Sequence, residues 1–451
     1  MFSFIRNYFR PAPHRERLPE HLIRSKYRWC RISVFQASFI GYCAAYLCRN
    51  NLAVVAGPMK DSLHYTTEMI GDILAVTAIA YGLSKFLMGA VSDRCNPRKF
   101  MAASLFLTGL LNFAFGATAN YHLHLILWAF NGVAQGMCGP PFSRILTHWF
   151  SPGERGTIAG TWNISHNIGG GLAGIIAAFA AGHWGWSSAF FVPGIINFLL
   201  SFYLLYFLRD TPQSEGLPPI EEYRNDYTQE ELSHGGKTQE QELSTRELFV
   251  NYILKNKVLW LLAVANFFVY IVRYSMLDWA PLYLSEVKGA NLATGGWAIL
   301  MVEFGGIPST LLLGWLSDKM GGRRSMLCLY CMLLVVIAFL VIILNPPGNQ
   351  MIDLCALAMV GFFTYPTVFL LSIAAIDAVS KKAAGTGSGF VGLWGYIGRT
   401  VQAKTFGGVV HNVSATSGAV VAWGYVLWSI VGCAVMGAIL FFFLRKTRPK
   451  G

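Results

Sequence analysis

The feature that most constrains this chain is a series of long apolar segments, each about as long as the roughly 20 residues that a helix needs to cross a bilayer. Only 13% of the 451 residues are charged, against about 25% in soluble globular domains. The sequence therefore predicts an all-α membrane protein with twelve transmembrane helices, and it excludes a soluble or disordered chain. The predicted spans are residues 33–56, 71–92, 99–118, 122–147, 157–182, 186–208, 258–284, 293–316, 325–345, 351–379, 386–410 and 419–444.

Lysine and arginine are concentrated in alternate connections between these spans. The formal net charge is +12, and the connections on one side hold only Lys60 and Lys288. Because basic residues favour the cytoplasmic side of a span, both termini are expected in the cytoplasm. The basic N-terminal stretch is explained by this topology, so neither a signal peptide nor nucleic-acid binding is predicted.

Internal repetition divides the chain into two six-helix halves, 33–208 and 258–444. Between them lies the one long polar connection, 209–257, and cytoplasmic tails are expected at 1–32 and 445–451. The segments Gly89-Ala-Val-Ser-Asp93-Arg94 and Gly314-Trp-Leu-Ser-Asp318-Lys319 are separated by almost the same number of residues as Arg49 and Arg273. Duplicated halves with a substrate site at the midplane are a known transporter plan.

The repeated aspartates follow the second and eighth spans, and a basic residue comes next. An aspartate at a helix end can pair with basic side chains and helix termini, and can thereby latch one conformation. We therefore assign Asp93, Arg94, Asp318 and Lys319 to ion-pair gating and not to ligand contact.

Ionisable residues inside spans are costly and mark functional sites. Here cations outnumber acids five to two before the histidine is counted, so the interior calls for an anion from outside. The residues are Arg49, Lys85, His166, Arg273, Asp278, Glu303, Arg399 and Lys404.

The repeat places Arg49 and Arg273 at equivalent depth in opposite halves, facing each other across a central cavity. A guanidinium binds phosphate or carboxylate through two parallel hydrogen bonds and stays charged when desolvated. The two arginines could instead extend to an interface or pair with Asp278 and Glu303. We predict that they bind an anionic ligand.

For the other residues in the spans the sequence leaves alternatives open. His166, among Asn163, Ser165 and Asn167, is either a ligand or a packing residue, and Lys85 either binds ligand or neutralises Asp93. Asp278 and Glu303 hold Arg273 or bridge to cations of the first half, or else they bind protons. Candidate hydroxyl donors are Tyr42, Tyr46, Tyr270, Tyr274, Tyr365 and Tyr396.

Nothing in the sequence predicts an enzyme, a cofactor or a metal site. There is no phosphate-binding P-loop, and the glycines at 169–174 follow no strand, so they indicate close helix packing. The Cys328-x-x-Cys331 pair lies in an apolar run without nearby histidine or carboxylate. The expected partners are small anions and the lipid bilayer, and the expected assembly is a monomer.

Several motifs resemble those of the organophosphate:phosphate antiporters of the major facilitator superfamily, which includes bacterial glycerol-3-phosphate and hexose-phosphate transporters. The resemblance runs over nearly the whole chain. It is carried by Tyr46-Leu-Cys-Arg49-Asn50, Tyr81-Gly-Leu-Ser-Lys85, Glu154-Arg-Gly-Thr157, Trp162-Asn-Ile-Ser-His166-Asn167, Asp210-Thr-Pro-Gln-Ser214, Tyr270-Ile-Val-Arg273 with Asp278-Trp279, and Lys381-Lys-Ala-Ala-Gly385.

This resemblance implies a major facilitator fold in a bacterial cytoplasmic membrane and exchange of an organophosphate for inorganic phosphate. It implies that Arg49 and Arg273 grip the phosphate with His166 as a third ligand, and that Asp278 and Glu303 switch ion pairs. The residues implied around the cavity are Lys85, Tyr42, Tyr46, Tyr81, Asn163, Tyr270, Tyr365 and Tyr396, to which we add Arg399, one turn from Tyr396.

Departures from the family pattern bear on the substrate. Asn50 stands where the glycerol-3-phosphate transporters carry lysine, and Ser388 and Val391 replace the Asp and Lys of hexose-phosphate uptake transporters. The Asn-Ile-Ser-His-Asn segment resembles the hexose-phosphate branch, so a hexose 6-phosphate such as glucose 6-phosphate is our first expectation. Glycerol 3-phosphate remains an alternative, as do a sugar-phosphate sensor and a proton-coupled symporter.

Overall fold

A computed structural model of the chain describes residues 7–92, 94–151, 153–226, 254–320, 323–379 and 384–445. Within these ranges the fold is all-α, with no strand, as the sequence predicts. Nine described helices are long and apolar enough to cross a membrane. They are α4 (Thr67–Ser92), α5 (Pro97–Gly116), α8 (Arg155–Trp184), α9 (Ser188–Phe207), α13 (Lys257–Lys288), α14 (Leu292–Lys319), α15 (Arg324–Leu344), α16 (Gln350–Asp377) and α18 (Ala419–Leu444).

The other three predicted spans correspond to helices that are broken or carry charges. The first is split into α2 (Glu20–Leu47) and α3 (Asn51–Leu63), and the fourth into α6 (Tyr121–Gly136) and α7 (Pro141–Trp149). Prolines 140 and 141 explain the second break, because a proline cannot donate the next helical hydrogen bond. The eleventh is α17 (Ala384–Ser417), which contains Arg399 and Lys404.

The break between α2 and α3 is stabilised by side-chain amides of the neighbouring helix α6. Asn131 Nδ2 donates to the Cys48 carbonyl at 3.1 Å, and Gln135 Nε2 donates to the Ala45 carbonyl at 2.7 Å. Unpaired backbone carbonyls would be costly inside a membrane, and these amides satisfy two of them. Residue 49 therefore lies at a fixed interruption of the first span.

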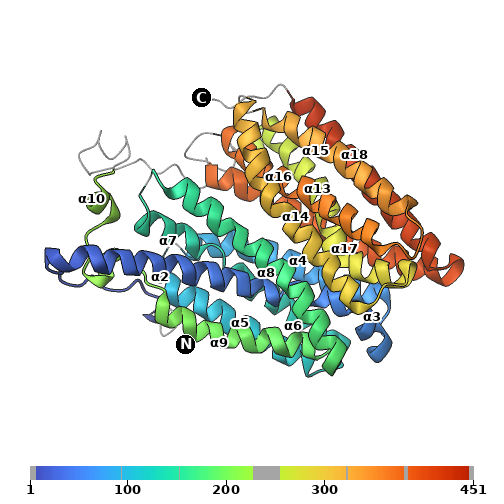
Figure 1. The fold of residues 1–451 in the computed structure, drawn as a ribbon, viewed down its shortest axis with the longest axis horizontal. Coiled ribbons are helices and arrows are strands. Elements are labelled where there is room, and N and C mark those ends of the chain that lie inside the picture. The colour runs from blue at the N-terminus through green and yellow to red at the C-terminus, as the bar shows by residue number, and fades with distance from the viewer. Residues whose placement is uncertain are drawn as a thin grey trace.

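Two bundles lie side by side, one formed by α2–α9 and the other by α13–α18 (Figure 1). They meet mainly along two helix pairs, α4 with α17 and α8 with α14, and α3 adds contacts with α13. Glycines bring the backbones close: a Cβ on Gly174 would lie 2.6 Å from the Gly296 carbonyl oxygen, and one on Gly71 would lie 2.5 Å from that of Ala403. Small residues at crossings let membrane helices approach in this way.

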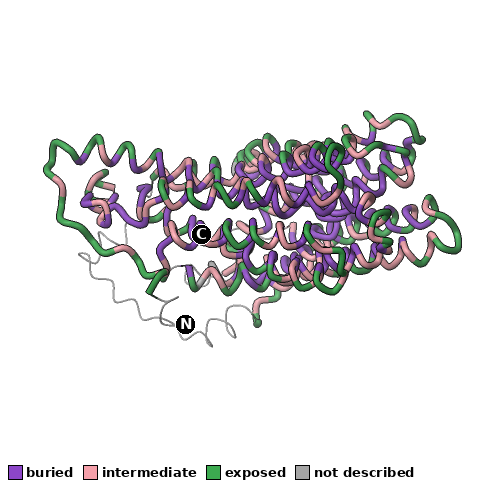
Figure 2. The backbone as a smooth tube through the Cα atoms, turned by 90° about the horizontal axis from the view of Figure 1, so that it is seen from below, coloured by how far each residue is buried: buried purple, intermediate pink, exposed green. Residues whose placement is uncertain are grey.

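These close approaches between the halves gather toward one end of the bundles. We call it the far end, because α2 begins and α18 ends at the opposite, terminal end. At the far end Lys60 pairs with Glu286 at 2.6 Å, and Lys404 pairs with Asp72 at 2.6 Å. Toward the terminal end α4 and α14 expose large apolar side chains, among them Leu87 and Leu311. Figure 2 shows the backbone coloured by how far each residue is buried.

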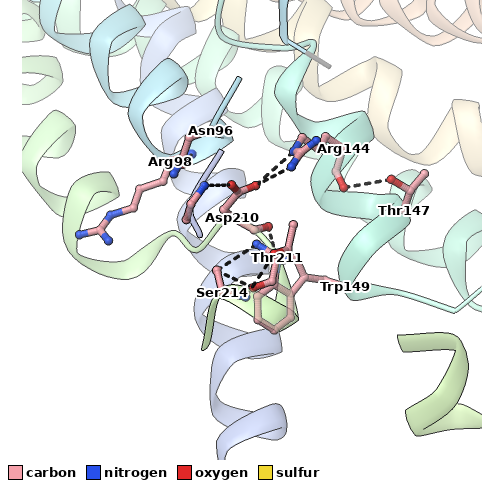
Figure 3. A network of polar contacts seen from close by, with 9 residues as sticks. Asn96, Arg98, Arg144, Thr147, Trp149, Asp210, Thr211 and Ser214 are labelled. Atoms are coloured by element: carbon pink, nitrogen blue, oxygen red, sulfur yellow. Dashed lines mark hydrogen bonds and ion pairs between the residues drawn. The ribbon is translucent and has the colours of Figure 1, made fainter. Parts of the chain in front are cut away.

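A polar network at the terminal end fastens residues 210–214 to the first half (Figure 3). The Asp210 carboxylate accepts hydrogen bonds from Arg144 Nε at 3.1 Å and from the Ala12 amide at 2.7 Å. The backbone carbonyl of Asp210 accepts one from Trp149 Nε1. Thr211 and Ser214 cap each other's backbone in the turn that follows. The Asp210-Thr-Pro-Gln-Ser segment therefore has a structural role, because it ties the start of the linker to α7 and to the N-terminal residues.

Some predicted boundaries differ from the observed ones. Helix α2 begins at Glu20, inside the predicted tail 1–32, and the start of the predicted linker, through α10 (Ile220–Arg224), packs against the first half through Leu217 and Ile220. Apolar side chains in these stretches explain the difference, because they bury themselves on the bundle. Residues 227–253 lie outside the described residues.

The predicted gating residues are only partly described. Asp93 and the side chain of Asp318 lie outside the described residues. Arg94 is exposed, and Lys319 Nζ lies 4.0 Å from the centre of the Trp315 ring. Their role in gating stays a prediction.

Candidate anion-binding site

A closed series of ring and guanidinium contacts joins the two halves near their middle. It contains both predicted arginines, a histidine and five tyrosines, contributed by the first span, α4, α8, α13, α16 and α17. We call it the arginine circuit. In order around the circuit its members are Arg49, Tyr46, His166, Tyr365, Arg273, Tyr274, Tyr396 and Tyr81.

Arg49 is held by aromatic faces and one amide. Its guanidinium carbon lies 4.3 Å from the Tyr46 ring centre and 3.9 Å from that of Tyr81. One nitrogen donates to Gln135 Oε1 at 3.3 Å, while Nη1 is buried with no hydrogen-bond partner among the described residues. A cation over tyrosine faces is attracted by the ring quadrupole but keeps its donors free.

Arg273 has a similar environment in the other half. Its guanidinium carbon lies 4.0 Å from the Tyr365 ring centre and 5.1 Å from that of Tyr274. Its buried Nε has no partner within the described part of the chain. Among the described residues, no carboxylate oxygen lies within 4.0 Å of a nitrogen of Arg49 or Arg273. Neither arginine is therefore held in a direct ion pair, although Glu303 hydrogen-bonds Tyr365, whose ring Arg273 contacts.

His166 lies between the two arginines. Its ring centre is 5.7 Å from that of Tyr46 and 5.8 Å from that of Tyr365, so it bridges tyrosines that contact Arg49 and Arg273. Its Nδ1 hydrogen-bonds the carbonyl of Asn163, one turn earlier on α8. This bond leaves Nε2 available for a ligand.

Two more predicted residues, Tyr42 and Tyr270, lie beside the circuit, and a third, Lys85, lies farther along α4. Tyr42 packs 5.4 Å from Tyr46 and stacks on Trp162 at 4.4 Å, and Tyr270 lies 5.3 Å from Tyr396. Lys85 is exposed, one turn beyond Tyr81 toward the terminal end of α4. The structure thus gathers Tyr42 and Tyr270 at the circuit and places Lys85 outside it.

Arg399 is committed to an ion pair that the sequence did not predict. It binds Asp278 through two hydrogen bonds, of 2.7 and 3.2 Å, and Gln402 adds a third donor to the same carboxylate at 2.8 Å. The Arg399 guanidinium also lies 4.0 Å from the Tyr274 ring centre. For Asp278 the sequence left open a pairing with Arg273, a bridge to cations of the first half, or proton binding. In this conformation it neutralises Arg399, which reaches it from α17.

Glu303 joins the two halves without a cationic partner in the described residues. Its carboxylate accepts from Tyr365 of its own half, and from Asn167 at 3.2 Å and Asn50 at 3.4 Å in the other. The expected bridge to cations of the first half is therefore replaced by two amides. Breaking this side of the interface requires both bonds to be lost.

Sequence reasoning missed the residues that support the charged groups. Gln135 and Gln402 were not singled out, and Asn50 was noted only as a departure from the family pattern. A polar side chain inside an apolar span was the available signal, because such a group must find a partner in the protein. Lys404, whose role was left open, pairs with Glu68 and Asp72 across the halves.

Two six-helix halves that meet over a shared buried site are the architecture of an alternating-access membrane carrier. The family model described as Major Facilitator Superfamily matches residues 38–403. A solved bacterial homologue of the human lysosomal transporter Spinster superposes with a TM-score of 0.72, at 18% identity, over 92% of this chain and 97% of its own.

Curated relatives are closer in sequence. A glycerol-3-phosphate transporter of Bacillus subtilis is 46% identical over 90% of this chain and 91% of its own length. A "Probable hexose phosphate transport protein" of Chlamydia pneumoniae is 37% identical over 96% of this chain and 95% of its own. The chain belongs to the organophosphate:phosphate antiporter family of the major facilitator superfamily. It is thus a multi-pass membrane transporter of organophosphates and not an enzyme, which confirms the predicted fold class and family.

Proposed function

We propose that this protein exchanges an organophosphate for inorganic phosphate at a single site formed by Arg49, Arg273 and His166. The observation that carries the proposal is the arginine circuit, in which two buried guanidiniums from opposite halves are linked through Tyr46, His166 and Tyr365. Neither has a carboxylate within 4.0 Å among the described residues. A phosphate monoester supplies the missing negative charge and accepts several hydrogen bonds at once.

The exchange follows from charge. When the site is empty, the two arginines repel each other, and this repulsion opposes drawing the halves together around it. A bound dianion offsets the repulsion, so only the loaded carrier passes between its two conformations. A ligand shifts such an equilibrium only by its difference in affinity for the two states. Organophosphate and phosphate both satisfy the site, and each therefore carries the other's return.

Glycerol 3-phosphate is the first substrate to test, and glucose 6-phosphate the second. The preference for a hexose rested partly on Asn50, but Asn50 hydrogen-bonds Glu303. The relative at 46% identity is named as a glycerol-3-phosphate transporter. The Asn-Ile-Ser-His-Asn segment around His166 keeps the hexose phosphate as a candidate.

The test is counterflow in proteoliposomes loaded with inorganic phosphate. External labelled glycerol 3-phosphate or glucose 6-phosphate should enter only when phosphate is inside, and unlabelled glycerol or glucose should not compete. Uptake driven by a pH gradient without internal phosphate would contradict exchange and support the proton-coupled symporter. Saturable binding with little flux would support the sensor.

The same proposal includes orientation and assembly. Both termini lie in the cytoplasm of a bacterium whose cytoplasmic membrane holds the carrier as a monomer. The described conformation is then closed toward the outside, because the ion pairs Lys60–Glu286 and Lys404–Asp72 join the halves at the far end. Protease access to residues near Arg15 from the inside face only would support this orientation.

A further inference from the structure

We propose a second binding station for phosphate-bearing anions in a basic pocket at the terminal end of the first half. It would hold phosphate or the organophosphate before passage to the arginine circuit. This inference rests on the proposed function for its physiological role, but the binding itself is tested separately.

The pocket is a cavity of about 460 Å³ between the start of α2, the end of α7, the start of α8 and α10. Four of its ten lining residues are arginines, Arg24, Arg28, Arg31 and Arg224, and none is acidic. The rest of the wall is largely apolar and includes Phe35, Phe150 and Ile158. Its volume far exceeds one phosphate, so an organophosphate also fits.

The neighbouring acid does not cancel this charge. Glu154 binds Arg31 at 2.5 Å and lies 3.7 Å from Arg224. Burial alone would raise the pKa of Glu154, but hydrogen bonds from Arg31 and from the Ser151 amide lower it below its ordinary value, so it stays ionised. One carboxylate among four guanidiniums leaves the pocket strongly positive, with Arg24 and Arg28 exposed.

One face of α2 connects this pocket to the arginine circuit. At 100° a residue, the pocket residues Arg24, Arg28, Arg31 and Phe35 lie within about 60° of arc of Tyr42 and Tyr46. Arg49 follows directly at the helix break. The helix therefore carries a line of basic and aromatic side chains from the terminal end to the central site.

Helix α8 provides the opposite wall of the same seam. Ile158 lines the pocket, Trp162 follows one turn later and His166 one turn after that. Trp162 stacks between Tyr42 and Phe142, at 4.4 and 3.9 Å, and separates the pocket from the circuit. The Trp162 indole is buried, and its Nε1 has no hydrogen-bond partner among the described residues. An anion moving along the seam would meet this unused donor midway.

A soluble anion is favoured over a lipid headgroup because the faces of α2 and α8 that line the pocket lead toward the circuit, with Trp162 and its stacked rings between the two. Clefts lined by charges of one sign concentrate counter-ions and raise association rates by about 10- to 1000-fold. The expected role is capture at low phosphate concentration, with a strong dependence on ionic strength.

The direct test uses phenylglyoxal, which modifies accessible arginines, followed by peptide mass spectrometry. It is done on purified Arg273→Ala protein, in which the central site is disabled, so failure of the exchange proposal does not affect the outcome. Inorganic phosphate at millimolar concentration should slow modification of Arg24 and Arg28 about fivefold. Arg15, which lines a separate pocket, is the internal control and should be unaffected. Potassium chloride of equal ionic strength should protect neither.

The transport test compares two double variants that each remove two charges. Arg24→Gln/Arg28→Gln should raise the KM for phosphate supplied from the terminal side about tenfold, with an unchanged maximal rate. Arg15→Gln/Lys26→Gln, in the separate pocket, should leave KM unchanged. If the first variant does not insert, Arg224→Gln on α10 gives a smaller shift in the same direction.

Three results would contradict anion binding in this basic pocket. The first is equal protection of Arg15 and Arg24 by phosphate, which would indicate ionic screening. The second is an equal KM shift in the two double variants. The third is protection by phosphatidylglycerol but not by inorganic phosphate, which would make the pocket a lipid headgroup site.

Discussion

The two halves hold their arginines in different ways. Arg49 lies at a helix break and is fixed by the amide of Gln135, whereas Arg273 lies inside the uninterrupted α13. Each guanidinium rests on two tyrosine faces. Equivalent positions of a duplicated chain thus reach similar chemical environments with different backbone conformations, a helix break at Arg49 and a continuous helix at Arg273.

The acids are divided even less evenly. Asp278 and Glu303, the carboxylates nearest the circuit, both belong to the second half, where Asp278 neutralises Arg399. The first half contributes Arg49 and His166 to the circuit. Its Asn50 and Asn167 side-chain amides donate hydrogen bonds to the Glu303 carboxylate. The second half therefore neutralises Arg399 from within, whereas Arg49 and Arg273 both lack a direct ion pair among the described residues.

The largest effect is expected from replacing the arginine of either half. Arg49→Lys and Arg273→Lys should each reduce phosphate exchange at least about 100-fold, because lysine keeps the charge but loses the bidentate geometry in a buried site. Exchange in proteoliposomes is the measurement, and normal membrane insertion is the control. Retained exchange in one variant only would show that the halves bind the anion unequally.

The next effect concerns the neutralised half. Asp278→Asn leaves Arg399 buried without its carboxylate and should cost about 3–5 kcal/mol of stability. The double variant Asp278→Asn/Arg399→Gln should recover most of this loss, because it removes both charges. Thermal unfolding in detergent measures both. A double variant as unstable as the single one would contradict the pairing.

A smaller effect is expected where the halves touch. The Cβ of Gly174→Val would lie 2.6 Å from the Gly296 carbonyl oxygen, whereas the Cβ of Gly182→Val on the same helix would have open space around it. Overpacking of about 1–3 kcal/mol should weaken far-end closure and slow exchange about tenfold for Gly174→Val only. Equal slowing in both variants would instead indicate a general effect on α8.

The smallest effect is expected from the exposed ion pairs of Lys404. This residue lies 3.1 Å from Glu68 and 2.6 Å from Asp72, and its side chain is 52% exposed. Lys404→Gln should therefore change far-end closure by no more than about 1 kcal/mol, and the difference should fade at high salt. Exchange rates at two ionic strengths measure it, and a large effect insensitive to salt would be inconsistent with this role.

The fold could be predicted because a bilayer leaves few choices. Long apolar runs must become helices, and a repeated Arg49–Arg273 landmark indicates paired halves. Tyr46 of the circuit and its neighbour Tyr42 were singled out because they lie one turn apart on the helix that carries Arg49, whereas Tyr81 was implied only by the family resemblance. These features depend on local spacing, which the sequence displays directly.

The charge pairing could not be predicted, because it depends on which helices meet. Asp278 and Arg399 are more than a hundred residues apart, and no spacing rule links α13 to α17. The break after α2 was also missed, since its freed carbonyls are satisfied by Asn131 and Gln135 from another span. Partners distant in sequence decide both features.

The interruption at residues 48–50 means that the first span does not have to move as one rod. Its short far-end piece, α3, carries Lys60 and the contact with Glu286, and its long piece, α2, carries Tyr42 and Tyr46. A rotation of α3 about Asn50 would break the far-end contact while Tyr42 and Tyr46 stay in place on α2. The far end could then open without moving the tyrosines of the binding site.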